Sequence, residues 1–550
     1  MAGFQPRRRH RRLAVLAGLF LLAGAAVGIT FLVLALTDSH GPDRILRKAH
    51  TLRGSLITRH IHLRRTARLA KLPLAKLRPL ERRREKEKAP RLTPVAAEAP
   101  DIQSSDFPAT SVTQGQSRIT ILQNKAVDAG HASFTAEPHV AQKGERVLEV
   151  WNWGAAFSHD GGRTFTFVSP YDFFSDTDDK EFCCDQLAYY EPEHDLWIWV
   201  LQYSDGVPAE HLSLRILAAK GDANFDATKF AVWDIDASRF GSPTAVAPAS
   251  DLDQPRIAST NEYLFISANL FPPSATDSSS YVGSLVFRMP LGELAAGTQS
   301  PGLQFFQTDL GTAGLTRGAT DTMYIASHLT NAKLRVWSWP DGELTISDHD
   351  VIHRSYPYRP KLHYLCPRKG ARPSRKGNWC LGYRASSYKN DDRPQSGWVS
   401  NDVIGFAWNA QQKPTSKFKY PFVMVVRINA KDMSLKDTPF IWSPKYAYQY
   451  AAIIPNSRGD LGGVLHLGGG SKYETCAAVV RGGNAASKSP WSATEVDRSD
   501  HDPDEPRAGD YLGATTDAAS PDTWAGSCMT LHGAGTRESV AVRFLSFRQG

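Results

Sequence analysis

The chain has 550 residues, more than one compact globule usually holds, although repeat folds escape this limit because they grow by adding modules. Its net charge of +8 is unevenly distributed. Residues 1–100 hold 22 Lys and Arg against 6 Asp and Glu, which leaves 42 basic and 50 acidic residues in 101–550. The basic character therefore belongs to the N-terminal arm, and the mildly acidic body argues against nucleic acid as its partner.

An uncharged apolar run from Leu13 to Leu36 follows a cluster of five arginines within residues 7–12. Its 24 residues are enough to cross a bilayer as a helix. A cleaved signal peptide is the alternative, but its apolar core would span about 7–15 residues, and Val33-x-Ala35 matches a cleavage site only weakly. We expect residues 1–12 to be a basic N-terminus and 13–36 an uncleaved transmembrane signal anchor.

Residues 37–110 separate this run from the body. Arg44 to Lys88 is basic, with Leu and Ile at roughly helical spacing, which fits a helix on an anionic membrane surface or a solvated stalk. Ala89 to Ala109 is rich in Pro and Ala, as in linkers. Basic residues on both sides of the apolar run leave the orientation open. The cysteines and the strand pattern favour a body outside the cytoplasm.

The body, 111–550, reads as short strands rich in β-branched and aromatic residues and bounded by Gly, Pro, Asn and Asp. No long segment has a helical period, so we expect an all-β fold. Representative predicted strands are Arg118–Leu122, Arg146–Trp151, Leu196–Leu201, Tyr263–Ser267, Phe422–Arg427 and Val540–Leu545.

These strands group into units that each open with polar residues and recur about every 62 residues, a longer period than WD40 or kelch repeats. The expected openings lie near Glu137, Asp185, Asp253, Arg317, Tyr383, Gln449 and Asp510. Four-stranded units that pack radially form a β-propeller, of seven blades or of six if the irregular region from Cys366 to Trp398 is an insertion. Closure would pair Val540–Phe547 with an early strand such as Arg118–Leu122. An array of two-sheet sandwiches is the alternative.

Six cysteines suit disulfides outside the cytoplasm, although their connectivity is not set by sequence. Cys366 and Cys380 would close a short loop, and Cys476 and Cys528 form the plausible long pair. Cys183 and Cys184 would bridge each other or pair elsewhere. The alternative is six buried thiols. There is no Cys-x-x-Cys pair, so a structural zinc site is not expected.

One motif connects the body to a family. Ser158-His-Asp160-Gly-Gly162-Arg-Thr164-Phe165 fits Ser-x-Asp-x-Gly-x-Thr-Trp/Phe, in which the Asp accepts hydrogen bonds from its own turn and the glycines supply special backbone angles. It resembles the BNR/Asp-box repeat of the sialidase-like propellers, and Trp339-Pro-Asp341-Gly342-Glu343 looks like a degenerate copy. In that family the box is a structural turn far from the active site, so the resemblance implies a fold rather than an activity.

Ligands of propellers usually meet the mouth of the central channel, where the polar unit openings converge. The candidate ligand-binding residues are Glu137, His139, Asp185, Gln186, Gln254, Arg256, Arg317, Arg384, Gln449 and Tyr450, and the candidate catalytic residues, if the protein is an enzyme, are Asp253, Asp510 and Tyr511. Converging carboxylates would suit Ca²⁺, which prefers oxygen ligands. The alternative is that each Asp caps its own turn. No other metal or cofactor is indicated.

The resemblance also frames the question of catalysis. Sialidases use an arginine cluster on the substrate carboxylate, a Tyr–Glu nucleophile pair and an Asp acid, for which Arg256, Arg317, Arg384, Arg507, Tyr511 and Asp253 are available. The expected Arg-Ile-Pro is missing, since Arg256-Ile257-Ala258 is the nearest match and lies too far into the chain. The hypothesis is a membrane-anchored propeller outside the cytoplasm that recognises a glycan or a surface protein. A glycoside hydrolase and a purely structural surface protein are the alternatives.

Overall fold

The structure is a computed structural model, and it describes residues 46–48, 50–51, 113–114, 119–127, 136–174, 180–205, 211–240, 250–271, 283–356, 392–411, 418, 420–469, 472–481, 491–500, 509–532 and 540–550. The predicted anchor Leu13–Leu36 and the predicted site or disulfide residues Cys366, Cys380, Arg384 and Arg507 lie outside this part. Within it, no helix is long and apolar enough to cross a membrane.

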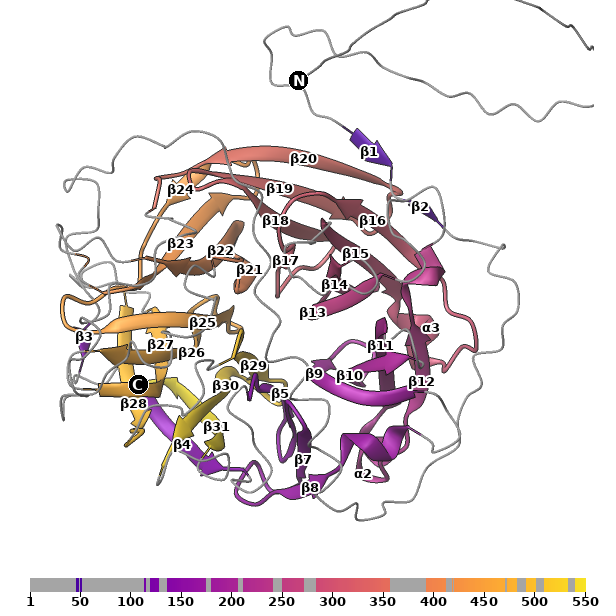
Figure 1. Ribbon diagram of the computed structural model, residues 1–550, viewed down its shortest axis with the longest axis horizontal. Helices are drawn as coiled ribbons and strands as arrows, with labels where there is room; N and C mark the ends of the chain where they lie inside the picture. Colours follow the sequence, from indigo (N-terminus) through magenta and orange to yellow (C-terminus); the bar gives the residue numbers. More distant parts are fainter. Residues whose placement is uncertain are drawn as a thin grey trace, which may run out of the picture. The chain divides into compact units, whose positions relative to one another are not determined.

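Seven four-stranded antiparallel sheets, here called blades 1 to 7, are arranged around a central axis, each with its first strand innermost (Figure 1). Blade 1 holds β5 (His139–Lys143), β6 (Arg146–Trp151), β7 (Gly154–Ser158) and β8 (Thr166–Val168). Blade 2 holds β9 (Lys180–Glu191), β10 (Leu196–Asp205), β11 (His211–Lys220) and β12 (Ala231–Ile235). Blade 3 holds β13 (Asp251–Ser259), β14 (Tyr263–Phe271), β15 (Gly283–Pro290) and β16 (Gln304–Thr308). Blade 4 holds β17 (Gly314–Leu315), β18 (Thr322–Thr330), β19 (Lys333–Pro340) and β20 (Thr345–Ile352).

The remaining blades follow the same order. Blade 5 holds β21 (Ser396–Ser400), β22 (Val403–Ala410), β23 (Phe422–Asn429) and β24 (Leu435–Asp437). Blade 6 holds β25 (Ala447–Pro455), β26 (Leu461–Gly469), β27 (Lys472–Arg481) and β28 (Trp491–Asp497). Blade 7 holds β29 (Gly513–Asp517), β30 (Ser520–Leu531), β31 (Val540–Gln549) and β4 (Ile119–Ala126). Short helices α2 (Asp222–Asp226), α3 (Leu291–Ala295), η3 (Pro170–Phe173) and η4 (Ala237–Phe240) lie in connections.

The fold is thus a seven-bladed β-propeller, and the choice between six and seven units is settled at seven. The six representative strands are all confirmed, with β6 at the predicted bounds. The unit opening placed near Tyr383 is wrong, because the inner strand of blade 5 begins at Ser396. The sandwich alternative fails because each blade packs against two neighbours.

Ring closure joins the two ends of the described body. β4 pairs antiparallel with β31, from Ile119 opposite Gln549 to Ala126 opposite Arg543, so the predicted closure is confirmed. An early strand thereby completes the last blade and ties blade 7 to the start of the ring, which leaves fewer open sheet edges.

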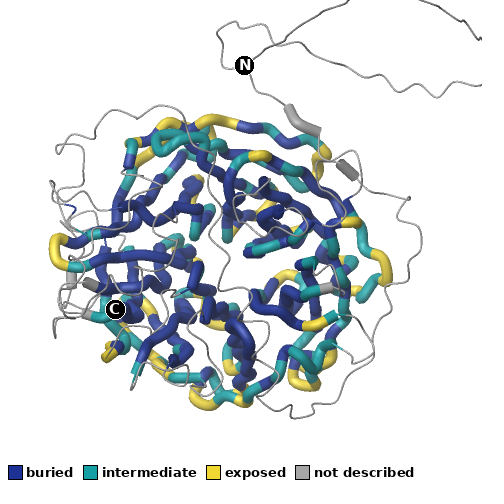
Figure 2. Tube along the Cα trace, in the orientation of Figure 1, coloured by how far each residue is buried: buried dark blue, intermediate teal, exposed yellow. Residues whose placement is uncertain are grey.

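The core consists of apolar layers between successive blades. Alternate side chains of a strand point to opposite faces of its sheet, so one strand serves two layers. In β10, Ile198 and Val200 pack toward blade 3, while Trp197 and Trp199 pack toward blade 1. The last layer, with Trp151 and Val542, joins blade 1 to blade 7. Buried residues fill the inner and middle strands, and exposed residues lie at turns and along the outer rim (Figure 2).

One disulfide strengthens the end of the ring. Cys476 of β27 is bonded to Cys528 of β30, with 5.9 Å between the Cα atoms, so the predicted long pair links blades 6 and 7. The predicted bridge of Cys183 with Cys184 is not formed, and both are buried thiols. The Cys184 thiol instead donates to Gln202 Oε1 at 2.7 Å.

Three short strands extend blades at their outer edges. β1 (Leu46–Lys48) pairs with β20, β2 (His50–Thr51) pairs with β16, and β3 (Thr113–Gln114) pairs in parallel with β28. The first two belong to the segment for which we expected helical spacing or a solvated stalk. Edge strands present unpaired N–H and C=O groups, and an extended segment can use these where a helix cannot.

The turn from Ser158 to Phe165 joins β7 to β8. Asp160 Oδ2 accepts a hydrogen bond from the Thr164 hydroxyl at 2.6 Å, and Oδ1 accepts from the main-chain N–H groups of Thr164 and Arg163 at 2.9 and 3.0 Å. These bonds, led by the one from the Thr164 hydroxyl, hold the pKa of Asp160 at about 2. The carboxylate thus organises its own turn.

The turn from Trp339 to Glu343 occupies the equivalent place between the third and fourth strands of blade 4, joining β19 to β20. Its carboxylate behaves differently. Asp341 Oδ1 accepts from the Thr260 hydroxyl of blade 3 at 2.7 Å. This turn therefore connects two blades, whereas the Asp160 carboxylate bonds only to residues of its own turn in the contacts given above.

Candidate functional site

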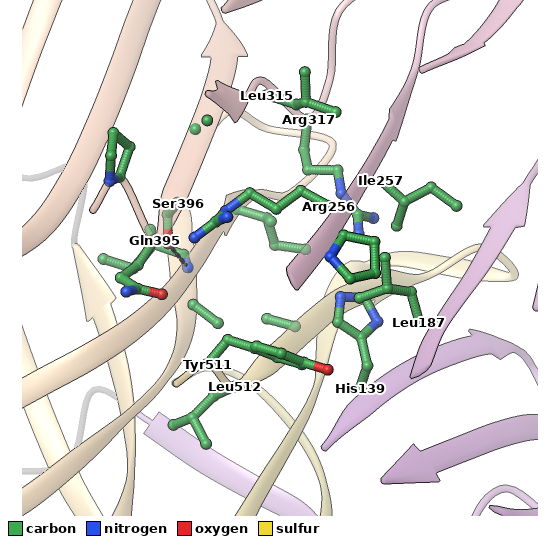
Figure 3. Close-up of a pocket in the computed structure, with 18 residues that line it drawn as sticks. His139, Leu187, Arg256, Ile257, Leu315, Arg317, Gln395, Ser396, Tyr511 and Leu512 are labelled. Atoms are coloured by element: carbon green, nitrogen blue, oxygen red, sulfur yellow. Dashed lines mark hydrogen bonds between the residues drawn. The ribbon is translucent and has the colours of Figure 1, made fainter. Parts of the chain in front are cut away.

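A cavity that is partly open to solvent lies among the innermost strands. All seven blades contribute to its wall, through His139, Leu187, Arg256, Leu315, Gln395, Ala452 and Leu512 among others (Figure 3). We call it the central cavity. Each blade offers residues of its inner strand or directly beside it, which is why a site on the axis draws on every repeat.

The charge of the cavity wall is positive. Arg256 and Arg317 line the cavity, and no Asp or Glu is among the described lining residues. Leu187, Ile257 and Leu315 supply apolar surface beside them. The cavity therefore combines fixed positive charge with apolar walls, an arrangement suited to a ligand with an anionic group and a partly apolar body.

Arg317 is held by its backbone and faces an aromatic ring. Its N–H donates to Gly397 O at 2.9 Å, and its carbonyl accepts from Val399 N at 2.7 Å, so blade 5 fixes its position. The guanidinium carbon lies 4.5 Å from the ring centre of Tyr189. None of the described carboxylates forms an ion pair with it. Burial lowers its pKa, and the charge remains available to an anion.

His139 lies in the same cavity as Arg317 and is neutral at physiological pH. Its Nδ1 lies 2.9 Å from Ala188 O, and since a carbonyl can only accept, Nδ1 carries the proton. Burial, followed by the charge of Arg317, lowers the pKa of His139 to about 3. The remaining ring nitrogen, Nε2, is therefore a hydrogen-bond acceptor.

Tyr511 crosses from blade 7 to pack against the apolar layer between blades 2 and 3. Its hydroxyl is buried beside the main chain of Gln186 and forms no hydrogen bond of normal geometry with described residues. Burial, with the charges of Asp185 and Glu137, raises its pKa well above the ordinary value. Tyr511 therefore stays protonated and can act as a donor.

Four buried residues form what we call the Asp510 network: Glu137, Gln254, Arg393 and Asp510. Asp510 Oδ2 accepts from Gln254 Nε2 and lies 3.5 Å from Arg393 Nη2. The main-chain N–H of Asp510 donates to Glu137 Oε1 at 2.8 Å. Asn152 Nδ2 donates to the other oxygen of Glu137 at 2.6 Å. The network joins buried polar groups of blades 1, 3, 5 and 7, and its four residues do not line the cavity.

The sequence-predicted residues divide into two groups that the structure brings together. His139, Arg256, Arg317 and Tyr511 line the central cavity (Figure 3). Glu137, Gln254 and Asp510 meet in the network beside it. The polar openings of the repeats therefore mark the axis of the ring, as expected.

Other predicted residues serve the packing of blades. Gln186 Nε2 donates to Trp151 O and Gly154 O, and its Oε1 accepts from Trp199, so it joins blades 1 and 2. These bonds use both N–H donors of its amide group. Asp253 accepts from Gln202 Nε2 at 3.0 Å and links blades 2 and 3.

The predicted residues of blade 6 also lie away from the cavity. Gln449 and Tyr450 are buried and do not line the cavity, and the ring centre of Tyr450 lies 5.9 Å from that of His466. The predicted Ca²⁺ site is also not formed, because the described residues contain no group of three or more His, Cys, Asp or Glu placed to hold a metal ion. Asp510 faces Arg393 and Gln254 instead.

Arg393 and Gln395 were missed by the sequence analysis. The available signal was a polar-Pro-polar triplet that occurs at the start of three inner strands, where the first residue joins the network and the third lines the cavity: Glu137-Pro138-His139, Gln254-Pro255-Arg256 and Arg393-Pro394-Gln395. Placing the opening of blade 5 near Tyr383 concealed the third copy.

Comparisons with known proteins add little. No protein-family model matches the chain, and no curated protein matches it. Among solved structures it is similar to the GH93 α-L-arabinofuranosidase of Fusarium graminearum in complex with arabinobiose, at 8% identity over 78% of this chain and 98% of that one, with a TM-score of 0.36. It is also similar to a mutant Trypanosoma rangeli sialidase displaying trans-sialidase activity, at 7% identity over 64% and 52%, with a TM-score of 0.32. Scores this low carry no argument, so the fold rests on strand topology.

Proposed function

We propose that this chain is a membrane-anchored, extracytoplasmic propeller of the sialidase-like kind that recognises the carboxylate of an acidic glycan in its central cavity. The observation that carries the proposal is the charge of the cavity, where Arg256 and Arg317 line the wall without any described lining carboxylate. A planar guanidinium matches a carboxylate in shape and hydrogen bonding.

The neutral groups of the cavity suit a sugar. His139 Nε2 can accept a hydrogen bond from a hydroxyl, and Tyr511 can donate one. Apolar surface from Leu187, Ile257 and Leu315 suits the less polar face of a sugar ring. The ligand would be held by charge at one end and by mixed contacts around its body.

The sialidase-like character and the membrane anchor are parts of this proposal with separate support. The self-held turn around Asp160 has the hydrogen bonds that the Asp-box pattern implies. The anchor is supported by the uncharged run Leu13–Leu36 after five arginines, and the disulfide of Cys476 with Cys528 suits a compartment outside the cytoplasm.

A glycoside hydrolase is the second candidate. Tyr511 lies close enough to Glu137 and Asp185 for their charges to raise its pKa, which resembles the Tyr–Glu pair of the sialidases. Hydrolysis also needs an acid facing the glycosidic oxygen. The absence of a carboxylate among the described lining residues favours binding over hydrolysis.

A glycan array separates these candidates. The full chain in detergent is applied to acidic glycans, to the same glycans as methyl esters, and to neutral glycans, and both bound protein and lost glycan are read. We expect binding to the acids, loss of binding to the esters, and no consumption of glycan. Glycan consumption would favour the hydrolase, and binding that ignores esterification would contradict the carboxylate proposal.

A further inference from the structure

The Asp510 network lies next to the central cavity, because Pro255, Pro394 and Tyr511, which line the cavity, directly follow Gln254, Arg393 and Asp510 in the chain. Along the inner strands each of its members comes two residues before a residue that lines the cavity. The pairs are Glu137 with His139, Gln254 with Arg256, Arg393 with Gln395, and Asp510 with Leu512. The network therefore lies at the end of the cavity where the inner strands begin.

The contacts of the network cross the axis of the ring. Blade 7 packs against blades 6 and 1, yet Asp510 of blade 7 contacts Gln254 of blade 3 and Arg393 of blade 5. Residues of non-neighbouring blades can meet only over the central space. Together with Glu137 of blade 1, the four side chains form a layer across the channel.

This layer is closed in the structure. The exposed fractions are 2% for Glu137, 8% for Gln254, 4% for Arg393 and 2% for Asp510. Buried charges are stable only while they are paired and hydrogen-bonded, so separating Asp510 from its partners needs compensation from water or from a ligand. The contacts of Asp510 thus favour the closed state.

We propose that the Asp510 network is a gate, and that a ligand reaches the central cavity from this end only when the contacts of Asp510 with Gln254 and Arg393 open. The inference rests on the proposed function, since the cavity is the proposed binding site. Access to the cavity from this end then scales with the fraction of molecules in which the gate is open.

The test places a reporter inside the cavity and needs no natural ligand. Ala452→Cys is introduced into the full chain in detergent, and labelling by 2-sulfonatoethyl methanethiosulfonate, a small anionic thiol reagent, is timed. Gln254→Gly is the gate variant, because Gln254 has a φ of +47°, which glycine adopts without strain. Gln142→Ala is the matched control, a buried polar residue bonded to Gly144 O outside the network.

We expect Gln254→Gly to accelerate labelling of the reporter by about tenfold or more, and Gln142→Ala to leave the rate unchanged. Buried Cys183 and Cys184 report on folding, because they stay unlabelled in a folded variant. If these cysteines become labelled in Gln254→Gly, that variant is replaced by Asp510→Asn, which keeps the shape of the side chain. The expected acceleration of labelling is the same. Equal rates in the parent and a folded gate variant would overturn the gate.

A second reagent separates the two proposals. The trimethylammonium analogue has a similar size and the opposite charge. If the anionic reagent labels every protein faster than the cationic reagent does, the cavity is positive, as the proposed function requires. The difference in labelling rate between the parent and the gate variant reports the gate. If the gate variant is labelled faster but the two reagents react equally, the gate is supported and the carboxylate site is contradicted. If the anionic reagent reacts faster but the gate variant and the parent have equal rates, the carboxylate site is supported and the gate is contradicted.

Discussion

At the scale of single residues, the site depends on how Arg317 and His139 affect one another. Blade 5 fixes the backbone of Arg317, and the ring of Tyr189 faces its guanidinium. The charge of this guanidinium, added to burial, keeps His139 neutral. One residue thus supplies positive charge and the other an acceptor, which a pair of two cations could not do.

Arg317→Gln should raise the pKa of His139 above about 3, while burial, the larger cause, keeps it below the ordinary value of 6.5. NMR titration of protein labelled with ¹³C-histidine measures this shift. Arg458→Gln, at an outer ion pair with Asp522, is the control and should leave His139 unchanged. An unaltered titration of His139 in Arg317→Gln would contradict the proximity of the two charges.

Sequence reasoning found four of the polar residues that line the cavity, His139, Arg256, Arg317 and Tyr511, because polar groups stand out at the openings of apolar repeats. It could not tell a polar group that joins two blades from one that faces the cavity. Gln186 looks like Gln254 in sequence, yet its three hydrogen bonds go to Trp151, Gly154 and Trp199. Only the neighbours in space decide that difference.

At the scale of strands and blades, two separate links secure the end of the ring. β4 completes blade 7 through its ladder with β31, and the disulfide of Cys476 with Cys528 joins blade 7 to blade 6. The closing strand was predictable, since both end segments have strand composition. The bulges in the inner strands of blades 3 and 6, where the register shifts after Asp253 and Gln449, gave no sequence signal.

Replacing Cys476 and Cys528 together by Ala should lower the free energy of unfolding by about 2–4 kcal/mol, the usual effect of removing a crosslink. Urea unfolding of the full chain in detergent, with and without reductant, measures it. Reductant should destabilise the parent more than the double variant. Equal stability of parent and double variant without reductant would show that the ladder alone secures the ring.

At the scale of the whole molecule, the layers between blades hold buried histidines whose pKa values burial lowers to about 3 for His139 and His328 and about 4 for His353. The unfolded chain binds their protons near pH 6.5, so it takes up more protons than the folded chain below that pH. Their contribution to stability is therefore complete above about pH 6.5 and falls as the pH drops toward 4.

His353→Gln should weaken this dependence, by at most about 1.4 kcal/mol per pH unit, because one proton fewer is taken up on unfolding. Denaturant unfolding at several pH values between 7 and 5 gives the slope, which is independent of any uniform loss of stability. An unchanged slope would show that His353 does not contribute to acid sensitivity.

The architecture of the propeller was largely predictable because a repeat copies one pattern several times and tolerates local errors. Only at blade 5 did the predicted unit opening miss the inner strand, because an irregular segment before Ser396 obscured the Arg393 triplet. The depth of the cavity and the layer across the channel depend on contacts between non-neighbouring blades, which no local pattern records.

The central claim is that Arg317 binds the carboxylate of a ligand in the cavity, and its most direct test is the affinity of Arg317→Gln for the acidic glycan that binds best on the array. A hydrogen bond to a charged group contributes about 1.5–3 kcal/mol, so we predict a loss of roughly 10- to 100-fold for Arg317→Gln and none for Arg458→Gln. Equal affinity of Arg317→Gln and the parent, in a protein whose Cys183 and Cys184 remain unlabelled, would contradict the account.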